Sequence, residues 1–175
     1  GYGIKRYNLM FNDFIIIGPK KDKNTCYNLK TTLRNILNNK KKFISRGDGS
    51  GTHKKELELW ESINSDPNKF TNWYKSIGQG MGPTLMMANQ IEGYTISDRG
   101  TWISFNNKNN LKIICENHPP LWNQYGIIAV NPEINTKINY KWANIYISWL
   151  ISEKGKKLIN NFKIKNNQIF FYNYK

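Results

Sequence analysis

The sequence contains few of the residues on which metal centres, disulfide frameworks and membrane anchors depend. It has two cysteines, Cys26 and Cys115, which form neither a metal-ligand pattern nor a dense disulfide framework. They could pair if the fold brought them together, but their spacing does not decide this, and free thiols are the favoured interpretation. The longest apolar run, 14–17, has the length of a strand and not of a membrane helix. Gly1 opens the sequence without a leader or a lipid-attachment cysteine, so the sequence does not reveal the compartment.

Residues in catalytic patterns are scarce as well. His53 and Glu56 form a His-x-x-Glu pair, but the second histidine that a zinc-protease helix needs is missing. Ser50 lacks the wider Gly-x-Ser-x-Gly spacing of a nucleophile elbow. Asp48 stands beside Arg46, where its carboxylate should stay ionised and order the loop instead of acting as a base. We therefore expect no enzyme activity, no catalytic residue and no metal ligand.

Lysine dominates a strongly basic composition. The net charge is +14, from 26 Lys and Arg against 12 Asp and Glu. The lysines are scattered among asparagines, and the densest run, Lys40-Lys41-Lys42, has no aromatic platform beside it. A solvated surface is favoured over a nucleic-acid footprint, so no nucleic-acid partner is expected, although a basic nucleic-acid-binding domain stays open as an alternative function. The positive field would still attract small anions.

Helix and strand patterns alternate along the chain. Strands are predicted over residues 9–17, 43–45, 73–74, 94–96, 111–115, 125–130 and 169–172, and helices from 26 or 28 to 38 and over 52–63, 83–90, 101–105, 140–150 and 152–162. The first strand should be buried on both faces, and helix 52–63 should bury Leu57, Trp60 and Ile63. Pro83 suits the first position of its helix. The alternation favours an α/β fold with largely parallel sheets.

The most informative segment is the glycine-rich loop 45–53, Ser-Arg-Gly-Asp-Gly-Ser-Gly-Thr-His. Its three glycines let a ligand approach the backbone closely. Ser50 and Thr52 bring hydroxyl groups to the start of a helix, where unpaired N–H groups and the helix dipole favour an anion. Arg46 adds a planar fork of donors that suits an oxyanion. The loop is therefore a predicted anion site.

Two further loops strengthen this prediction. Residues 78–82, Gly-Gln-Gly-Met-Gly, open a helix, and residues 97–101, Ser-Asp-Arg-Gly-Thr, open another with Asp98 as its N-cap. All three loops should meet at the carboxyl ends of strands, where α/β folds bind ligands. Nucleotide phosphate is the rival ligand, but the Gly-Lys-Ser/Thr ending of a P-loop and the Rossmann glycine spacing are both missing. A phosphate-ligand-binding domain therefore stays an alternative.

Six stretches carry a resemblance to a known family. They are NDFIIIGPK (12–20), FISRGDGSGTHKKELELW (43–60), WYKSIGQGMGPTL (73–85), YTISDRGTW (94–102), NQYGIIAVNP (123–132) and WLISEKGKKLI (149–159). In this order and spacing the chain resembles the tungstate-binding protein family, the substrate-capturing components of ABC transporters with the type II periplasmic-binding-protein fold. One mild departure is Ser97, which stands where the family often has threonine.

The resemblance implies a two-lobed clamp that holds tungstate or molybdate by charge-assisted hydrogen bonds, without catalysis and without a cofactor. Arg46 and Thr52 are the first expected contacts. The other expected oxyanion ligands come from all three loops: Ser45, Ser50, Gly51, Gln79, Gly80, Arg99 and Thr101. The resemblance also implies an ABC transporter permease as a partner, and a location in the periplasm or on the outer face of the cell membrane.

One part of the family pattern has no counterpart in the sequence. The family has a further stretch before the point that matches Gly1, with a Thr-rich anion-binding motif and the opening strands and helix of the first lobe. We therefore expect residues 12–124 to form the second, central lobe, complete with its loops. Residues 1–11 and 125–175 should form an incomplete first lobe. Such a chain would bind tungstate weakly, or would need the missing segment as a second chain.

Overall fold

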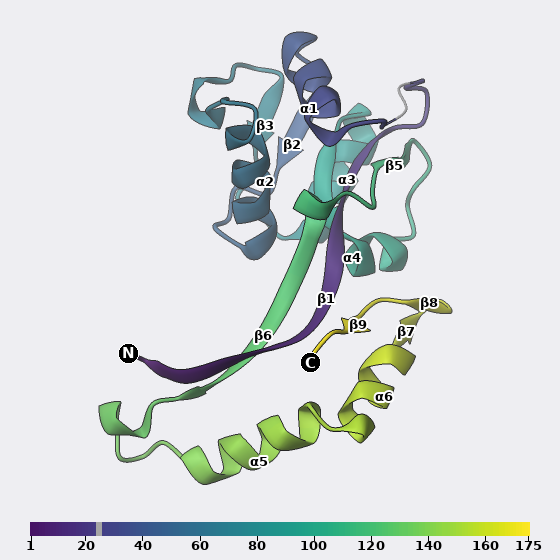
Figure 1. The fold of residues 1–175 in the computed structure, drawn as a ribbon. Helices are drawn as coiled ribbons and strands as arrows, with labels where there is room; N and C mark the ends of the chain where they lie inside the picture. Colours follow the sequence, from purple (N-terminus) through teal and green to yellow (C-terminus); the bar gives the residue numbers. More distant parts are fainter. Residues whose placement is uncertain (24–25) are drawn as a thin grey trace. The chain divides into compact units, whose positions relative to one another are not determined.

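The computed structural model describes residues 1–23 and 26–175, which fall into two units (Figure 1). Unit 1 contains residues 1–12 and 123–175, and unit 2 contains residues 13–122. A long strand, β1 (Gly3–Pro19), contributes its first part to unit 1 and its last part to unit 2. Among the described residues, no helix has the length and hydropathy that crossing a bilayer requires. The assignment of the two units to the lobes of a clamp stays a prediction.

Unit 2 holds most of the regular structure. Its helices are α1 (Leu29–Asn38), α2 (Gly51–Glu61), α3 (Met81–Ile91) and α4 (Arg99–Ser104), with short 3-10 turns η1 (Pro67–Lys69) and η2 (Pro119–Leu121). Besides β1, its strands are β2 (Phe43–Ser45), β3 (Tyr74–Ser76), β4 (Thr95–Asp98) and β5 (Leu111–Cys115). The elements agree with the predicted ones within a few residues, and the mixed α/β class is the predicted one.

Strand direction in unit 2 differs from the prediction of largely parallel sheets. β1 pairs antiparallel with β4 and with β5. The parallel strands are β2 and β3, and a parallel bridge between Phe43 and Tyr94 joins β2 to the residue before β4. The prediction was therefore wrong for β1. Alternating helices and strands imply parallel neighbours only where a crossover joins adjacent strands, and β1 instead pairs with two strands from later in the chain.

The core of unit 2 has two layers, one on each face of β1. Phe14 and Ile16 pack with residues of α1 and α2, whereas Ile15 and Ile17 pack with residues of α3 and α4. Each of these four side chains is at most 4% exposed, which confirms a strand buried on both faces. The two layers hold α2 and α3 against the strands whose ends carry the glycine-rich loops.

Helix α2 buries a different face from the one predicted. Trp60 and Ile63 are buried, as expected, but Leu57 is 38% exposed. The buried face instead includes Glu56 and Leu59. Residues 56, 59, 60 and 63 follow the i, i+3, i+4, i+7 spacing of a single helix face, and Leu57 lies about 100° away from its start.

Unit 1 contains the remaining elements. They are β6 (Trp122–Val130), which begins at the boundary between the units, η3 (Pro132–Ile134), α5 (Tyr140–Leu150), α6 (Glu153–Asn161), β7 (Lys163–Ile164), β8 (Asn167–Gln168) and β9 (Phe171–Tyr172). Both β6 and β9 pair with β1. Helix α5 has the predicted bounds. Ser152, where the predicted helix begins, caps α6, because its Oγ accepts a hydrogen bond from the N–H of Gly155.

Candidate anion-binding site

The first glycine-rich loop joins the end of β2 to the start of α2. Gly47 and Gly49 have positive φ angles of 62° and 71°, in the left-handed region that glycine enters without a Cβ penalty. Ser50 caps α2, because its Oγ accepts a hydrogen bond from the N–H of His53 at 3.3 Å. The N–H of Gly49 donates to Nδ1 of His53 at 3.0 Å. These bonds fix a tight turn at the N-terminus of α2.

Arg46 and Asp48 form an ion pair within this loop. Two guanidinium nitrogens of Arg46 donate to Oδ2 of Asp48 at 3.1 and 2.5 Å, and Oδ1 accepts from the N–H of Ser50 at 3.1 Å. Hydrogen bonds from Ser50, followed by the pairing with Arg46, lower the pKa of Asp48 to about 2. Asp48 is therefore ionised at neutral pH, which supports the loop-ordering role. Arg46 has five N–H groups and uses two of them here.

The first turn of α2 leaves two backbone donors open. Within the described part of the chain, the N–H groups of Gly51 and Thr52 have no acceptor. The next N–H groups are satisfied: that of His53 by the Ser50 cap, and that of Lys54 by the carbonyl of Ser50 at 2.9 Å. A Cβ added at Gly51 would meet no atom within 4 Å, so the space beside it is open. Two open N–H groups at a helix N-terminus favour an anion there.

The second glycine-rich loop lies directly against the first. The N–H of Ile77 donates to the carbonyl of Ser45 at 3.2 Å, and the N–H of Gln79 donates to the carbonyl of Arg46 at 3.2 Å. These two bonds continue the parallel pairing of β2 with β3 beyond the strand ends. The structure therefore brings Gln79 next to Arg46, as the three-loop prediction requires for this pair of loops.

Helix α3 begins in this second loop. It starts at Met81, with Gly80 as an N-cap that makes no side-chain hydrogen bond. The prediction placed Pro83 at the first helical position, but Pro83 occupies the third. This position remains compatible with proline, because the first N–H groups of a helix have no intrahelical partner.

The third loop differs from the other two, since its polar side chains already have partners. Asp98 caps α4 as predicted, accepting from the N–H and the Oγ1 of Thr101 at 2.8 and 2.6 Å. Arg99 donates to both carboxylate oxygens of Asp13 at 2.7 and 2.5 Å and lies 2.7 Å from Glu116. The bond to Asp13 raises the pKa of Arg99 further above its ordinary value. An anion-binding role for Arg99 and Thr101 stays a prediction.

The sequence analysis missed a buried carboxyl group on α2. Glu56 is 2% exposed and accepts a hydrogen bond from the hydroxyl of Tyr74 at 2.6 Å. Burial raises the pKa of Glu56 to about 7. Two neighbours are also buried, Ser45 and Trp60, and their side-chain hydrogen bonds to the Glu56 carboxyl offset part of this rise. The i, i+4 spacing of Glu56 to Trp60 was the available signal that this carboxyl faces the core.

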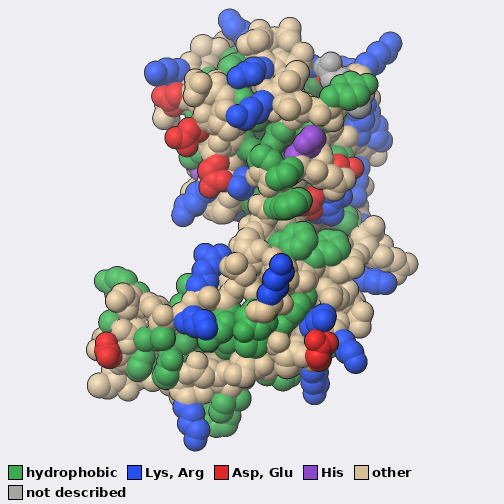
Figure 2. Space-filling view, viewed as in Figure 1, with side chains coloured by type: hydrophobic (Ala, Val, Ile, Leu, Met, Phe, Trp, Pro, Cys, Tyr) green, Lys and Arg blue, Asp and Glu red, His purple; other side chains and the backbone are tan. Residues whose placement is uncertain are grey.

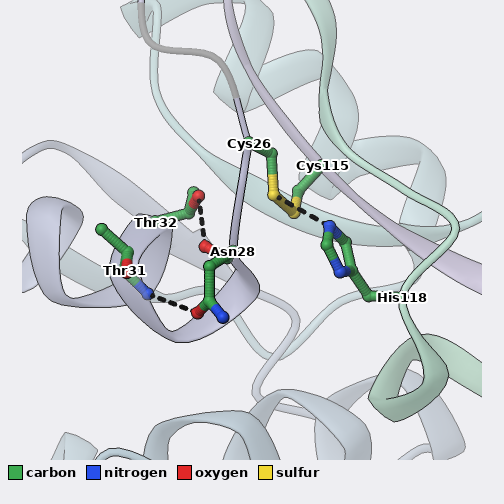
Figure 3. The surroundings of a disulfide bond; sticks show 6 residues. All are labelled: Cys26, Asn28, Thr31, Thr32, Cys115 and His118. Carbon is green, nitrogen blue, oxygen red and sulfur yellow. Dashed lines mark hydrogen bonds between the residues drawn. A yellow bond between two sulfur atoms is a disulfide. The ribbon is translucent and has the colours of Figure 1, made fainter.

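Cys26 and Cys115 form a disulfide bond, so the expectation of free thiols was wrong (Figure 3). Their Cα atoms lie 5.1 Å apart, although 89 positions separate them in the sequence. Both residues belong to the core layer of α1 and α2, a proximity that spacing does not report. Nε2 of His118 lies 3.4 Å from Sγ of Cys26. Potential metal-ligand atoms of the three residues lie within 4.8 Å of one another, but the disulfide uses both sulfurs.

Helices pack on both faces of β1, and the glycine-rich loops follow β2, β3 and β4, an arrangement that is consistent with the class of protein found by comparison. Residues 1–154 match the family described as the PBP superfamily domain, where PBP stands for periplasmic binding protein. This match covers most of the chain.

Individual relatives narrow the assignment within that class. The tungstate-binding protein TupA of Peptoclostridium acidaminophilum is 43% identical over 167 residues, which cover 93% of this chain and 58% of the relative. The solved tungstate-binding protein TupA from Desulfovibrio alaskensis G20 is 38% identical with a TM-score of 0.89, covering 100% of this chain and 72% of that one. The structure described as the tungstate ABC transporter from Geobacter sulfurreducens is 40% identical with a TM-score of 0.78. The match covers 93% of this chain and 69% of that one.

The chain belongs to the tungstate-binding protein family of the periplasmic-binding-protein superfamily. It spans between about half and two thirds of the length of the curated relatives that it matches. These relatives are named for ligand binding and transport and not for an enzyme activity.

Proposed function

We propose that this chain contributes to the capture of tungstate for an ABC importer and binds the anion without changing it chemically. The observation that carries the proposal is the pair of open N–H groups on Gly51 and Thr52, in the same loop as the guanidinium of Arg46. A tetrahedral dianion at this place would receive charge-assisted hydrogen bonds from Arg46 and favourable dipole interaction from α2. The names of the relatives support tungstate as that anion.

The two loops in contact supply the proposed ligands. Arg46 donates from its guanidinium, and Gly51 and Thr52 donate from their backbone N–H groups. Ser50 can donate its hydroxyl proton while its oxygen accepts from His53. The remaining members of this set are Ser45, a buried residue at the end of β2, and Gln79, whose N–H donates to the carbonyl of Arg46, with its neighbour Gly80.

Residues of the third loop have a supporting role in this proposal. Arg99 and Thr101 are committed to Asp13 and Asp98, and breaking those pairs would leave a partly buried carboxylate without its partner. They therefore fix the start of α4 against β1 and are not the primary contacts to the anion. No residue of the site acts as a catalyst, and no cofactor is needed. Molybdate has the same charge and shape as tungstate, so it would occupy the same donors.

The disulfide supports a location outside the cytosol. Disulfide bonds form and persist in oxidising compartments and are rare in the cytosol of most cells. The Cys26–Cys115 bond thus favours the periplasm or the outer face of the cell membrane. At that location the partner would be the permease of an ABC transporter, which is the setting named for the relative from Geobacter sulfurreducens.

The two units would form the two jaws of the clamp. Unit 2 carries both open loops, and in this proposal it corresponds to the complete central lobe of residues 12–124. Unit 1 would correspond to the incomplete first lobe, made of residues 1–11 and 125–175. All the contacts proposed above come from unit 2, so residues 1–175 as a separate polypeptide should bind the anion with modest affinity.

Calorimetric titration with tungstate, molybdate, sulfate and phosphate tests the proposal. Tungstate and molybdate should saturate the isolated chain in the micromolar range or weaker, with sulfate and phosphate weaker still. Nanomolar tungstate affinity, about −12 kcal/mol, would contradict the expectation that the contacts from unit 2 alone give modest affinity. Preference for phosphate would favour the phosphate-ligand alternative. Affinity for DNA that falls steeply with salt, with no preference among small anions, would favour the nucleic-acid alternative suggested by the charge of +14.

A further inference from the structure

The Cys26–Cys115 bond and His118 form a cluster at the end of β5 that the proposed anion site does not use (Figure 3). Cys115 is the last residue of β5, is fully buried, and lies opposite Ile16 in the pairing of β5 with β1. Cys26 is half-buried and packs against the same core layer. Figure 3 shows the imidazole of His118 directed towards the sulfurs. Three side chains that can each bind a metal ion therefore converge at one place.

A short turn brings His118 back to the end of β5. Two residues separate it from Cys115, and the second of them, Asn117, has a positive φ of 59°, a conformation that asparagine adopts more readily than most residues. His118 is the N-cap of η2, but its side chain makes no capping hydrogen bond. Its carbonyl accepts a hydrogen bond at 2.9 Å from the N–H of Leu121, which is fully buried. The backbone of His118 is thus fixed on both sides, and its imidazole has no capping role.

The distances suit a zinc ion held by two thiolates and one imidazole. Zinc binds sulfur at about 2.3 Å and imidazole nitrogen at about 2.0–2.1 Å, and a tetrahedral angle then places the sulfur and the nitrogen about 3.6 Å apart. Nε2 of His118 lies 3.4 Å from Sγ of Cys26, and the ligand atoms of all three residues lie within 4.8 Å of one another. Two sulfur ligands in this geometry lie about 3.8 Å apart. Rotation of the cysteine side chains can reach that separation from Cα atoms 5.1 Å apart.

The rest of the described chain offers zinc little competition. No other group of three or more His, Cys, Asp or Glu side chains among the described residues brings ligand atoms this close together. Lys and Arg side chains cover much of the surface in Figure 2, and Asp and Glu appear at few places, in keeping with the net charge of +14. A positive field disfavours a divalent cation at exposed carboxylates. Thiolate ligands are selective for zinc and other thiophilic metals, so this cluster is where such an ion would bind.

We propose that Cys26, Cys115 and His118 bind Zn²⁺ when the disulfide is reduced, so that reduction exchanges a disulfide for a zinc site. Two molecules of a thiol reductant supply two electrons to the S–S bond. They become one disulfide and release two protons, and the S–S bond becomes two thiolates. The thiolates and Nε2 of the neutral imidazole bind the ion, with water in the fourth position. The disulfide excludes the ion because it uses the same two sulfurs.

The zinc ion would take over the structural task of the disulfide. It ties together the same two segments, the one that precedes α1 and the end of β5. A ligand that binds the folded chain and not the unfolded chain stabilises the fold. Zinc should therefore offset the loss of the cross-link in the reduced chain and leave the stability of the oxidised chain unchanged.

Titration of the reduced and the oxidised chain with Zn²⁺ tests the proposal. A phosphine reduces the disulfide and is removed under nitrogen before the titration. The reduced chain should bind one Zn²⁺ in the micromolar range or tighter, and the oxidised chain should bind at least about 100 times more weakly because it has no thiolate. Co²⁺, used as a spectroscopic substitute, should give a thiolate-to-cobalt charge-transfer band and the visible bands of a tetrahedral site only after reduction. Zn²⁺ should also raise the urea midpoint of the reduced chain alone.

The two histidines of the chain provide matched variants. His118→Ala removes one of the three ligands and should weaken Zn²⁺ binding to the reduced chain at least about tenfold. His53→Ala should leave the zinc affinity within twofold of that of the unchanged chain. Equal zinc binding before and after reduction would overturn the proposal, as would equal affinities of the two histidine variants or a cobalt spectrum without the thiolate band. Reduction that unfolds the chain does not leave the proposal untested, because failure of Zn²⁺ to restore the fold would overturn it too.

Discussion

The hydroxyl of Tyr74 on β3 donates a hydrogen bond to the carboxyl of Glu56 on α2, over 2.6 Å. The bond joins the helix that begins in the first glycine-rich loop to the strand that leads into the second. Glu56 is almost fully buried, and burial raises its pKa to about 7. The two loops of the candidate site therefore share a support that titrates near neutral pH.

This titration predicts a pH-dependent stability. The pKa of Glu56 is about 7 in the folded chain against an ordinary value of 4.5, so the folded state binds the proton more tightly. Stability from this group is present below pH 4.5 and is lost as the pH rises towards and through 7. The loss should reach up to about 3 kcal/mol. When urea unfolding is measured at a series of pH values, the free energy of unfolding of the unchanged chain should fall as the pH rises from 4.5 to 7. In Glu56→Gln this slope should disappear.

A control on the same helix separates this effect from general charge. Glu58 is exposed and pairs with Lys55. Glu58→Gln should leave the slope between pH 4.5 and 7 in place. A slope that persists unchanged in Glu56→Gln would show that other groups cause it.

The sequence predicted local features well because their causes are local. Helix 140–150 and strand 111–115 have the predicted bounds, and Asp98 and Ser152 act as the predicted caps. In each case the period or the capping side chain lies within a few residues of the element it defines.

Features that depend on distant pairing were missed. The Cys26–Cys115 bond and the Arg99–Asp13 pair join residues 89 and 86 positions apart. The antiparallel direction of β1 has the same origin, because it depends on β4 and β5. For the candidate site, the sequence predicted the first two loops as partners, and the structure shows them hydrogen bonded to each other. The sequence gave no indication that Arg99 is already paired with Asp13.

Removal of the Arg46 guanidinium should weaken tungstate binding strongly. Hydrogen bonds to a charged group contribute about 1.5–3 kcal/mol, so Arg46→Ala should lose about 10- to 100-fold in affinity by calorimetry. Part of this loss would come from Asp48, whose carboxylate would lose its cation. Arg46→Ala/Asp48→Asn should therefore recover some affinity. Lys30→Ala, at an exposed position of α1, should change affinity less than twofold, and an equal loss would point to the general positive field.

The two positive-φ glycines of the first loop should differ in their tolerance of a side chain. An alanine at either position adopts a left-handed conformation that costs about 1–2 kcal/mol. At Gly47 the new Cβ would also collide with Oγ of Ser76, whereas at Gly49 it meets no atom within 4 Å. Gly47→Ala should thus lose more thermal stability and more tungstate affinity than Gly49→Ala, because it pushes the two loops apart. Adding Ser76→Ala should restore part of both losses, and equal behaviour of the two glycine variants would contradict this account.

Reduction of the disulfide should destabilise unit 2. The bond closes a long loop, and the chain-entropy description assigns about 4–5 kcal/mol to a loop of this size, with measured values commonly nearer 2–4. Cys26→Ser/Cys115→Ser should lower the urea midpoint to the same extent as a thiol reductant lowers that of the unchanged chain. His118→Ala keeps the bond and should have a much smaller effect, since its ring contributes one contact at 3.4 Å. Both cysteines lie in unit 2, so quenching of Trp142 and Trp149 in unit 1 should stay the same after reduction under native conditions. Equal midpoints with and without reductant would mean that the packing of α1 and β5 alone holds these segments together.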